Sequence, residues 1–198
     1  MPQSSQSVQI DECATIAKAK GVLTQVRYRF RGHRGEWKEN EREIYDNGNS
    51  AVALPFDPER STVLLARQLR MPPFLQDGRE SFLEACAGKL EGEDPEKRMI
   101  KEIEEELGYR IGKLDRLFEL YMSPASFMEK ITFFTCRYSP ADKVSKGGGL
   151  ADEGEDIEVT EIDIGKASAM IGNDIVDAKT VILIQSLNHR LRGSTKIK

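Results

Sequence analysis

The first regular pattern along the chain is a period of two. Residues 22–30 place apolar, aromatic and threonine side chains at alternate positions, which is typical of a half-buried strand. Turn residues follow at 31–35, and residues 37–45 are predicted to form the returning strand. Because an isolated hairpin is only marginally stable in water, we expect it to pack on the rest of the chain or on a second copy of it.

Beyond residue 50, short apolar segments alternate with turn residues. Predicted strands cover residues 51–55, 62–69, 82–87, 116–121, 131–138 and 157–162. A helix is predicted from Asp94 as N-cap, with Pro95 in the first turn, to a stop at Gly108. Two more helices are predicted at residues 165–171 and 177–192. The irregular alternation of these elements predicts an α/β (mixed α+β) fold, with a mixed sheet and helices on both faces.

The composition excludes several classes of protein. Hydrophobic residues make up 39% and charged residues 31%, so a disordered polyelectrolyte is excluded. The formal net charge of −4 offers no basic surplus for phosphate backbones, which disfavours a nucleic-acid binder. Three cysteines without CxxC spacing predict neither a disulfide framework nor a zinc site.

The hydropathy of the chain gives no sign of a membrane association. No apolar run approaches the roughly 20 residues that a bilayer span requires. The first 20 residues have neither the apolar core of a signal peptide nor the arginine bias of a transit peptide. We therefore expect a soluble cytoplasmic protein that binds neither membranes nor nucleic acid.

The predicted helix that ends at Gly108 concentrates the candidate chemistry. Its core-facing arc comprises Met99, Ile100, Ile103 and Leu107. Glu102, Glu105 and Glu106 fall on another arc, and the carboxylates of the last turn oppose the helix dipole by roughly 0.3–1 kcal/mol each. Ion pairs from Arg98 to Glu102 and from Lys101 to Glu105 would make this an ordinary solvated acidic face. A divalent cation such as Mg²⁺, which takes oxygen ligands, would also relieve the repulsion. The pattern alone leaves both interpretations open.

The same segment resembles the Nudix box, the motif of hydrolases that cut nucleoside diphosphates linked to another moiety. Matching positions are Gly88, Glu102, Ile103, Glu105, Glu106 and Gly108. Lys101 stands where the family usually has arginine, and Glu93 takes the earlier acidic position after a gap one residue shorter than usual. The similarity then widens to the GDP-mannose pyrophosphatases of the Nudix superfamily, at residues 42–46, 67–70, 84–88, 117–124, 147–149, 155–159 and 179–181.

The resemblance implies a Nudix fold, an α/β/α sandwich with a mixed sheet plus an N-terminal antiparallel hairpin. Residues 47–198 would form the hydrolase domain, and residues 1–46 would exchange between the subunits of a homodimer. The implied reaction is hydrolysis of the pyrophosphate bridge of a nucleotide sugar, with Mg²⁺ or Mn²⁺ as cofactor. GDP-mannose is the first substrate expected, giving GMP and mannose 1-phosphate, and ADP-ribose is the alternative.

The resemblance also implies roles for individual residues. The metal would be held by the carbonyl of Ala87 and by Glu102, Glu106 and Glu155, with Glu105 supporting them. Glu106, Glu129 and Glu155 would be catalytic, and the choice of general base stays open between Glu129 and Glu155. The substrate would contact Glu41, Arg42, Glu43, Arg70, Ala87, Gly88, Lys89, Glu129 and Lys179. Arg42 and Arg70 would face phosphates, because guanidinium groups match phosphate oxygens bidentately.

Three departures bear on the choice of substrate, and the first two concern contacts with the base. Glu41 stands where the GDP-mannose enzymes have a basic residue, Lys20 lies near the place of a stacking tyrosine, and Ala125 replaces a glycine. We therefore expect weaker discrimination between guanine and adenine than is usual in that family. A sensor that binds a nucleotide sugar without cutting it is the less favoured alternative, because such modules typically lose a box glutamate.

Overall fold

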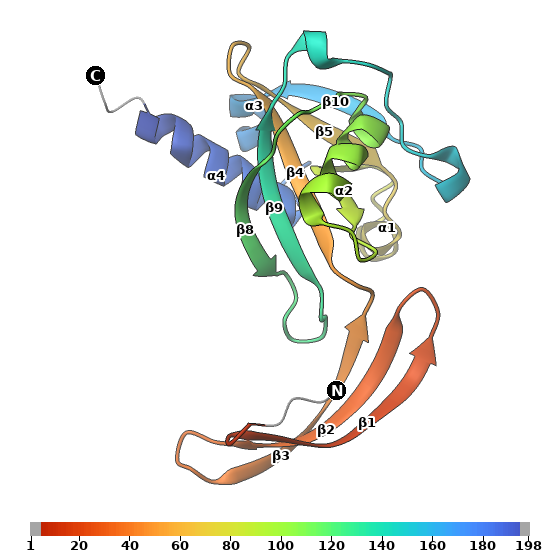
Figure 1. Cartoon of the computed structure of the whole chain (residues 1–198), viewed down its shortest axis with the longest axis vertical. Helices are drawn as coiled ribbons and strands as arrows, with labels where there is room; N and C mark the ends of the chain where they lie inside the picture. Colours follow the sequence, from red (N-terminus) through yellow and green to blue (C-terminus); the bar gives the residue numbers. More distant parts are fainter. Residues whose placement is uncertain (1–4, 195–198) are drawn as a thin grey trace. The chain divides into compact units, whose positions relative to one another are not determined.

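The computed structural model describes residues 5–194 of the 198-residue chain. Residues 1–4 and 195–198, the outer ends of the predicted segments 1–46 and 47–198, lie outside the described part. The described residues divide into two compact units. We call residues 5–49 with 121–130 the N-terminal unit, and residues 50–120 with 131–194 the main unit (Figure 1).

The N-terminal unit is built on a three-stranded antiparallel sheet in the order β1-β2-β3. Its strands are β1 (Val8–Lys18), β2 (Val22–Arg31) and β3 (Trp37–Asp46). The register of β2 and β3 runs from Val22 opposite Asp46 to Arg31 opposite Trp37, which confirms the predicted hairpin. The sequence predicted no strand before residue 22, and β1 corrects this. This strand is mostly exposed, and it is held by backbone pairing with β2 and by ion pairs such as that of Asp11 with Arg29 at 2.7 Å.

Residues 121–130, which connect the predicted strands at 116–121 and 131–138, also belong to the N-terminal unit. Tyr45 N–H donates to the carbonyl of Ser126 at 2.8 Å, and Met128 N–H donates to the carbonyl of Tyr45 at 3.1 Å. The rings of Tyr45 and Phe127 meet edge to face at 5.7 Å. Residues 121–130 therefore pair with the end of β3.

The main unit is built on a seven-stranded mixed sheet. Its strands are β4 (Ser50–Asp57), β5 (Thr62–Gln68), β6 (Phe82–Glu84), β7 (Cys86–Lys89), β8 (Asp115–Tyr121), β9 (Lys130–Arg137) and β10 (Glu158–Asp163). The order is β10-β5-β4-β9-β8, with β6 paired to β5 and β7 paired to β4. The central strands β4 and β9 are parallel, whereas β4–β5 and β5–β10 are antiparallel. All eight residues of β4 are buried, as expected for a strand covered on both faces.

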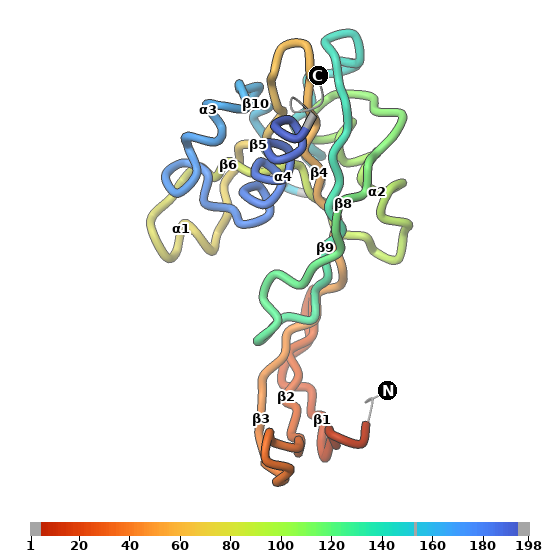
Figure 2. The backbone as a smooth tube through the Cα atoms, turned by 90° about the vertical axis from the view of Figure 1, so that its left-hand side faces the viewer, coloured from red at the N-terminus to blue at the C-terminus, as the bar shows by residue number. Residues whose placement is uncertain are grey.

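Helices cover both faces of this sheet. Figure 2 shows α2 (Pro95–Glu102) and α4 (Ala178–Ser194) on opposite sides of β4, and both helices contact that strand. The short helix α3 (Ile164–Ala169) follows β10 and contacts α4. Met99, Ile103 and Leu107 are fully buried on one side of the sheet, and Leu183 and Ile184 are buried on the other. The predicted α/β/α sandwich with a mixed sheet is confirmed.

The helix that carries the glutamates begins and ends where the sequence predicted. The side chain of Asp94 accepts hydrogen bonds from the N–H groups of residues 96 and 97, both at 3.1 Å. Gly108 ends the helix in the left-handed conformation, with φ of 77°. However, residues 103–107 form a π-helical turn instead of continuing the α-helix. The predicted pair of Lys101 with Glu105 is also wrong, because Lys101 contacts Glu93 at 2.7 Å.

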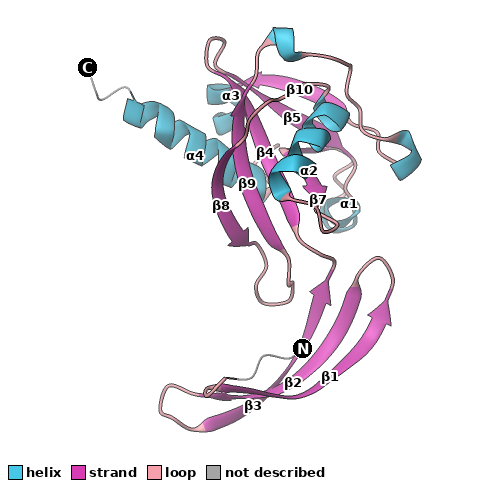
Figure 3. Cartoon of the chain, viewed as in Figure 1, coloured by secondary structure: helices cyan, strands magenta, loops and turns pink. Residues whose placement is uncertain are grey.

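The remaining helical segments are short and were not predicted (Figure 3). They are α1 (Met71–Asp77) and the 3₁₀ turns Pro140–Asp142 and Ala151–Glu153. Two prolines lie in the first turn of α1, where the missing N–H groups need no partner within the helix.

None of the helices in residues 5–194 has the length and apolarity to cross a bilayer.

Candidate active site

The glutamate helix lies directly against strand β7. Ala87 and Gly88 of β7 pair with Val52 and Ala51 of β4, which fixes this backbone in the sheet. A Cβ atom at Gly88 would overlap the carboxylate of Glu102. The glycine therefore provides the space that lets the Glu102 carboxylate reach the backbone of β7 at the residue after Ala87.

Two glutamates of the helix are buried. Glu102 is 5% exposed and Glu106 is 2% exposed. The carboxylate of Glu102 pairs with Arg98 at 2.5 Å, which confirms that predicted ion pair. The Oε2 atom of Glu106 is buried without a hydrogen-bond partner. A buried carboxylate oxygen without a partner is costly, and a bound cation would supply one.

Burial and neighbouring carboxylates raise the pKa of both carboxyls. Burial raises the pKa of Glu106 to about 8, against a hydrogen bond from the Cys86 thiol, and the charges of Glu102, Glu155 and Glu84 raise it further. Burial raises the pKa of Glu102 to about 6, although Arg98 opposes this shift. Such shifts are common at functional sites. They identify a cluster of carboxyls at the end of the helix whose ionisation is unfavourable without a bound cation.

The glycine-rich loop brings Glu155 to this cluster. The N–H groups of Gly148 and Gly149 donate to the carbonyls of Glu106 and Glu105 at 2.9 and 3.1 Å. These bonds satisfy carbonyls that the end of a helix leaves unpaired. Leu150 N–H donates to Oε2 of Glu155 at 2.9 Å, and a Cβ atom at Gly149 would overlap this carboxylate. The loop thus contacts the helix end and folds Glu155 back over its own glycines.

The donor set of the cluster fits a hard divalent cation, which prefers carboxylate and carbonyl oxygens. In the arrangement that the structure shows, no three His, Cys, Asp or Glu side chains within residues 5–194 lie close enough together to hold a metal ion. Arg98 neutralises Glu102 in this arrangement. A cation would therefore compete with Arg98 for Glu102, while the unpaired oxygen of Glu106 is available to it.

Two of the predicted substrate residues, Arg70 and Lys179, lie beside Glu84, which was not among the predicted site residues. Arg70, at the start of α1, contacts Glu84 through Nε at 2.6 Å. Lys179, in the first turn of α4, lies 2.6 Å from Asp177 and 3.9 Å from Glu84. Lys89 lies on β7 opposite Ser50. The available signal for Glu84 was an acidic residue inside the apolar segment 82–87.

The other predicted substrate residues belong to the N-terminal unit. Glu41 of β3 pairs with Arg27 at 2.9 Å, and Arg42 donates to the side chain of Asn40 at 2.6 Å. Glu43 lies opposite Gln25 on the same strand. Glu129 is half-buried in the connection 121–130.

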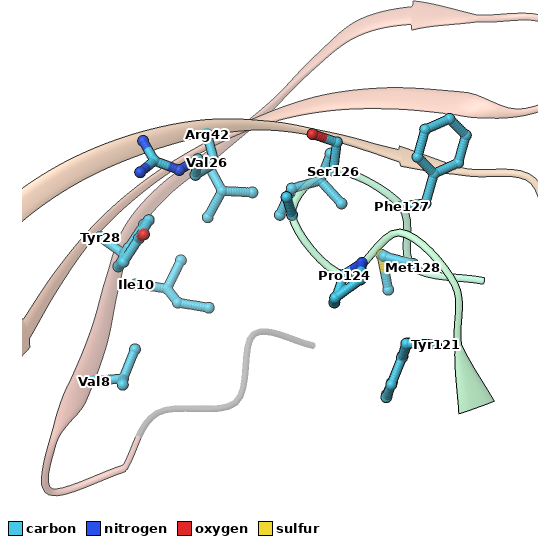
Figure 4. Close-up of a pocket in the computed structure, with 12 residues that line it drawn as sticks. Val8, Ile10, Val26, Tyr28, Arg42, Tyr121, Pro124, Ser126, Phe127 and Met128 are labelled. Atoms are coloured by element: carbon cyan, nitrogen blue, oxygen red, sulfur yellow. The ribbon is translucent and has the colours of Figure 1, made fainter. Parts of the chain in front are cut away.

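Arg42 lines a cavity of about 570 Å³ in this unit. In Figure 4 Arg42, Val26 and Tyr28 lie on the sheet, and Pro124, Ser126 and Met128 come from the connection. The lining consists of Val8, Ile10, Val26, Tyr28, Arg42, Ile44, Tyr121, Pro124, Ala125, Ser126, Phe127 and Met128.

The fold and the buried glutamates are typical of one class of protein. Comparison with known families identifies this class. The model of the NUDIX domain matches residues 46–167, more than half of the chain. The chain therefore belongs to the Nudix family, which confirms the resemblance seen in its glutamate helix. Nudix hydrolases generally use divalent metal ions.

Comparison with individual curated proteins gives a more specific similarity than the family does. The chain is 38% identical over 187 residues to the GDP-mannose pyrophosphatase of Citrobacter koseri, covering 93% of this chain and 96% of the relative. It is 41% identical over 169 residues to the GDP-mannose pyrophosphatase of Escherichia coli O1:K1 / APEC, covering 84% and 87%. A crystal structure described as an ADP compounds hydrolase has the same fold, with a TM-score of 0.72, 19% identity and coverage of 99% of this chain and 100% of that chain.

Proposed function

We propose that this chain hydrolyses the pyrophosphate bond of a nucleotide sugar, with GDP-mannose cut to GMP and mannose 1-phosphate. The observation that carries the proposal is the buried pair Glu102 and Glu106 at the end of the helix, where Glu106 has an unpaired oxygen. Relatives named GDP-mannose pyrophosphatase, 36–41% identical over most of the chain, support the substrate.

The metal site would consist of the Ala87 carbonyl, Glu102, Glu106 and Glu155, with Glu105 beside them and Mg²⁺ or Mn²⁺ as the ion. When bound, such an ion neutralises phosphate charge and lowers the pKa of a coordinated water. Negative charge at this point of the helix is unfavourable without a cation, so the glutamates themselves favour its binding. Glu155 and Glu129 remain the two candidates to accept the proton of the attacking water.

Cationic side chains would bind the two phosphates. Arg70 and Lys179 flank Glu84 in the main unit, and a guanidinium binds phosphate oxygens bidentately. Because these cations are already held by carboxylates, little side-chain freedom would be lost when a diphosphate binds.

The N-terminal unit would complete the site of a second subunit. Ile16 and Trp37 are 50% and 44% exposed on its sheet, and such apolar exposure favours a homodimer. In that dimer Glu41, Arg42 and Glu43 would reach the nucleotide bound by the partner subunit. We place the enzyme in the cytoplasm.

ADP-ribose is the second candidate substrate, and the residues at the predicted base contacts support it. Glu41 stands in place of a basic residue and Lys20 lies near the place of a stacking tyrosine, the two positions at which the resemblance implies contacts with guanine. The structural neighbour described as an ADP compounds hydrolase shares the fold alone. Adenine nucleotides should therefore be cut more readily than by a strictly guanine-specific enzyme.

The test is turnover across GDP-sugars, ADP-sugars and ADP-ribose with Mg²⁺ and with Mn²⁺. We expect GDP-mannose to be cut fastest, to GMP and mannose 1-phosphate, and ADP-ribose to be cut measurably. Rejection of ADP-ribose alongside fast GDP-mannose turnover would contradict the expected weak discrimination. Absence of turnover with every compound and both ions would refute the proposed function and favour the sensor.

A further inference from the structure

Glu84 is a buried carboxylate between two cations. It lies in β6, is 3% exposed, and accepts a hydrogen bond from Nε of Arg70 at 2.6 Å. The side chain of Gln68 donates to the same oxygen at 3.3 Å, and Lys179 lies 3.9 Å from the other oxygen. Burying a carboxylate is costly unless it is paired, so this placement needs an explanation.

The position of Lys179 is fixed from a second side. Asp177 contacts Lys179 at 2.6 Å and accepts hydrogen bonds from the N–H and hydroxyl of Thr180 at 3.0 and 2.7 Å. The hydroxyl of Thr180 in turn accepts a hydrogen bond from the N–H of Ala85 at 2.7 Å. This chain of bonds ties the start of α4 to the residue that follows Glu84, so the strand and the helix hold their side chains in one fixed arrangement.

The cations stay accessible although their carboxylates are buried. The side chain of Arg70 is 42% exposed and that of Lys179 is 21% exposed, against 4% for Glu84 and 8% for Asp177. The contact with Glu84 uses Nε of Arg70, which leaves the terminal amino groups of the guanidinium for a ligand. The buried acids thus hold two cations that remain partly exposed to solvent.

We propose that Glu84 is a positioning residue that fixes Arg70 and Lys179 to receive the diphosphate. The proposal rests on the proposed function, because it assigns the ligand of these two cations. Glu84 itself does not touch the substrate in this account. Its effect on binding passes through the two cations, and its carboxylate charge is what holds them.

The chain offers a matched control for a purely structural role. Asp57 is also 3% exposed and contacts an arginine side chain, Arg60, through Nε at 2.6 Å. This pair lies at the far end of β4, in the turn toward β5, and the site includes neither residue. Asp57→Asn should therefore disturb a comparable buried ion pair without changing phosphate binding.

The experiment compares Glu84→Gln with Asp57→Asn by steady-state kinetics on GDP-mannose and by calorimetric titration of GDP. We expect Glu84→Gln to raise KM and the Kd for GDP by about tenfold or more, with kcat changed less than about threefold, because uniform binding is lost. Asp57→Asn should change these values less than about twofold. In an Arg70→Ala background, Glu84→Gln should add only a small further effect, as expected for coupled residues.

Equal KM and Kd values for Glu84→Gln and Asp57→Asn would overturn the proposal, and so would fully multiplicative effects of Glu84→Gln and Arg70→Ala. If Glu84→Gln does not fold, Glu84→Asp keeps the charge but withdraws it from Arg70, and the same rise in KM is expected. A wild-type protein that binds GDP without cutting any nucleotide sugar would refute the proposed function, while the GDP titrations would still decide the role of Glu84.

Discussion

Replacing Glu106 by glutamine should stabilise the metal-free protein at alkaline pH and destabilise it slightly at acidic pH. The Glu106 carboxyl is 2% exposed, its Oε2 has no hydrogen-bond partner, and burial raises its pKa to about 8 from an ordinary 4.5. A carboxyl with a raised pKa stabilises the folded state fully below about pH 4.5. That contribution is lost as the pH rises through about 8, because the unfolded chain releases its proton first.

The magnitude follows from the two pKa values. Between 4.5 in the unfolded chain and about 8 in the folded protein, ionisation of Glu106 lowers the free energy of unfolding by about 4 kcal/mol at pH 8 and by less than about 1 kcal/mol at pH 5. Glutamine removes this loss but buries a new amide and alters the contact with the Cys86 thiol, which costs about 1–3 kcal/mol. The net gain at pH 8 should therefore be about 1–3 kcal/mol.

Urea unfolding of both proteins in the presence of a chelator measures this difference at the two pH values. The control is Glu104→Gln on the same turn, because Glu104 pairs with Arg110 at 3.0 Å and its pKa is lowered. That variant should gain no stability at alkaline pH. If Glu106→Gln were no more stable relative to wild type at pH 8 than at pH 5, the assignment of a buried, repelled carboxylate would be wrong.

Three further predictions concern the elements around the site. Gly149→Ala should lower turnover, because a Cβ atom there overlaps the Glu155 carboxylate, and also stability, because Gly149 has a left-handed φ of 77°; kinetics beside thermal melts would show both effects, and unchanged turnover would contradict the first. Asp94→Ala should lower the free energy of unfolding by about 0.5–2 kcal/mol through loss of the N-cap, whereas Asp94→Asn should cost less, as urea titrations would show. Mixing inactive Arg42→Ala and Glu106→Gln chains should partly restore activity if the dimer shares its sites. A monomeric protein, or no rescue despite proven subunit exchange, would exclude shared sites.

The elements that the sequence predicted well are those with local signals. Alternation predicted the hairpin of β2 and β3, and Asp94, Pro95 and Gly108 set the ends of the glutamate helix. Strand β1 was missed because register shifts between Ile10 and Glu12 and between Thr15 and Ala17 interrupt its alternation. The π-helical turn at residues 103–107 was equally invisible, since a search at 100° per residue assumes a regular α-helix.

Local signals in the sequence likewise predicted only part of the site. The spacing of Glu102 and Glu106 within one helix was readable, and the structure buries both carboxylates. The pair of Lys101 with Glu105 was wrong, because Glu93 lies within reach of Lys101 through the turn before the helix. Glu84 was missed because its partners come from other elements, Arg70 from the start of α1 and Lys179 from α4. Such a juxtaposition depends on the tertiary fold.

The central claim is that the buried carboxylates at the end of this helix carry out a metal-dependent hydrolysis of nucleotide sugars. The most direct test is the rate of GDP-mannose cleavage in Mg²⁺ by the wild-type protein and by Glu106→Gln, with the products identified. We predict GMP and mannose 1-phosphate from the wild type, and a fall in kcat of at least about a hundredfold in the variant, since the ion supplies several kcal/mol of charge stabilisation. A Glu106→Gln protein with wild-type turnover would contradict the account.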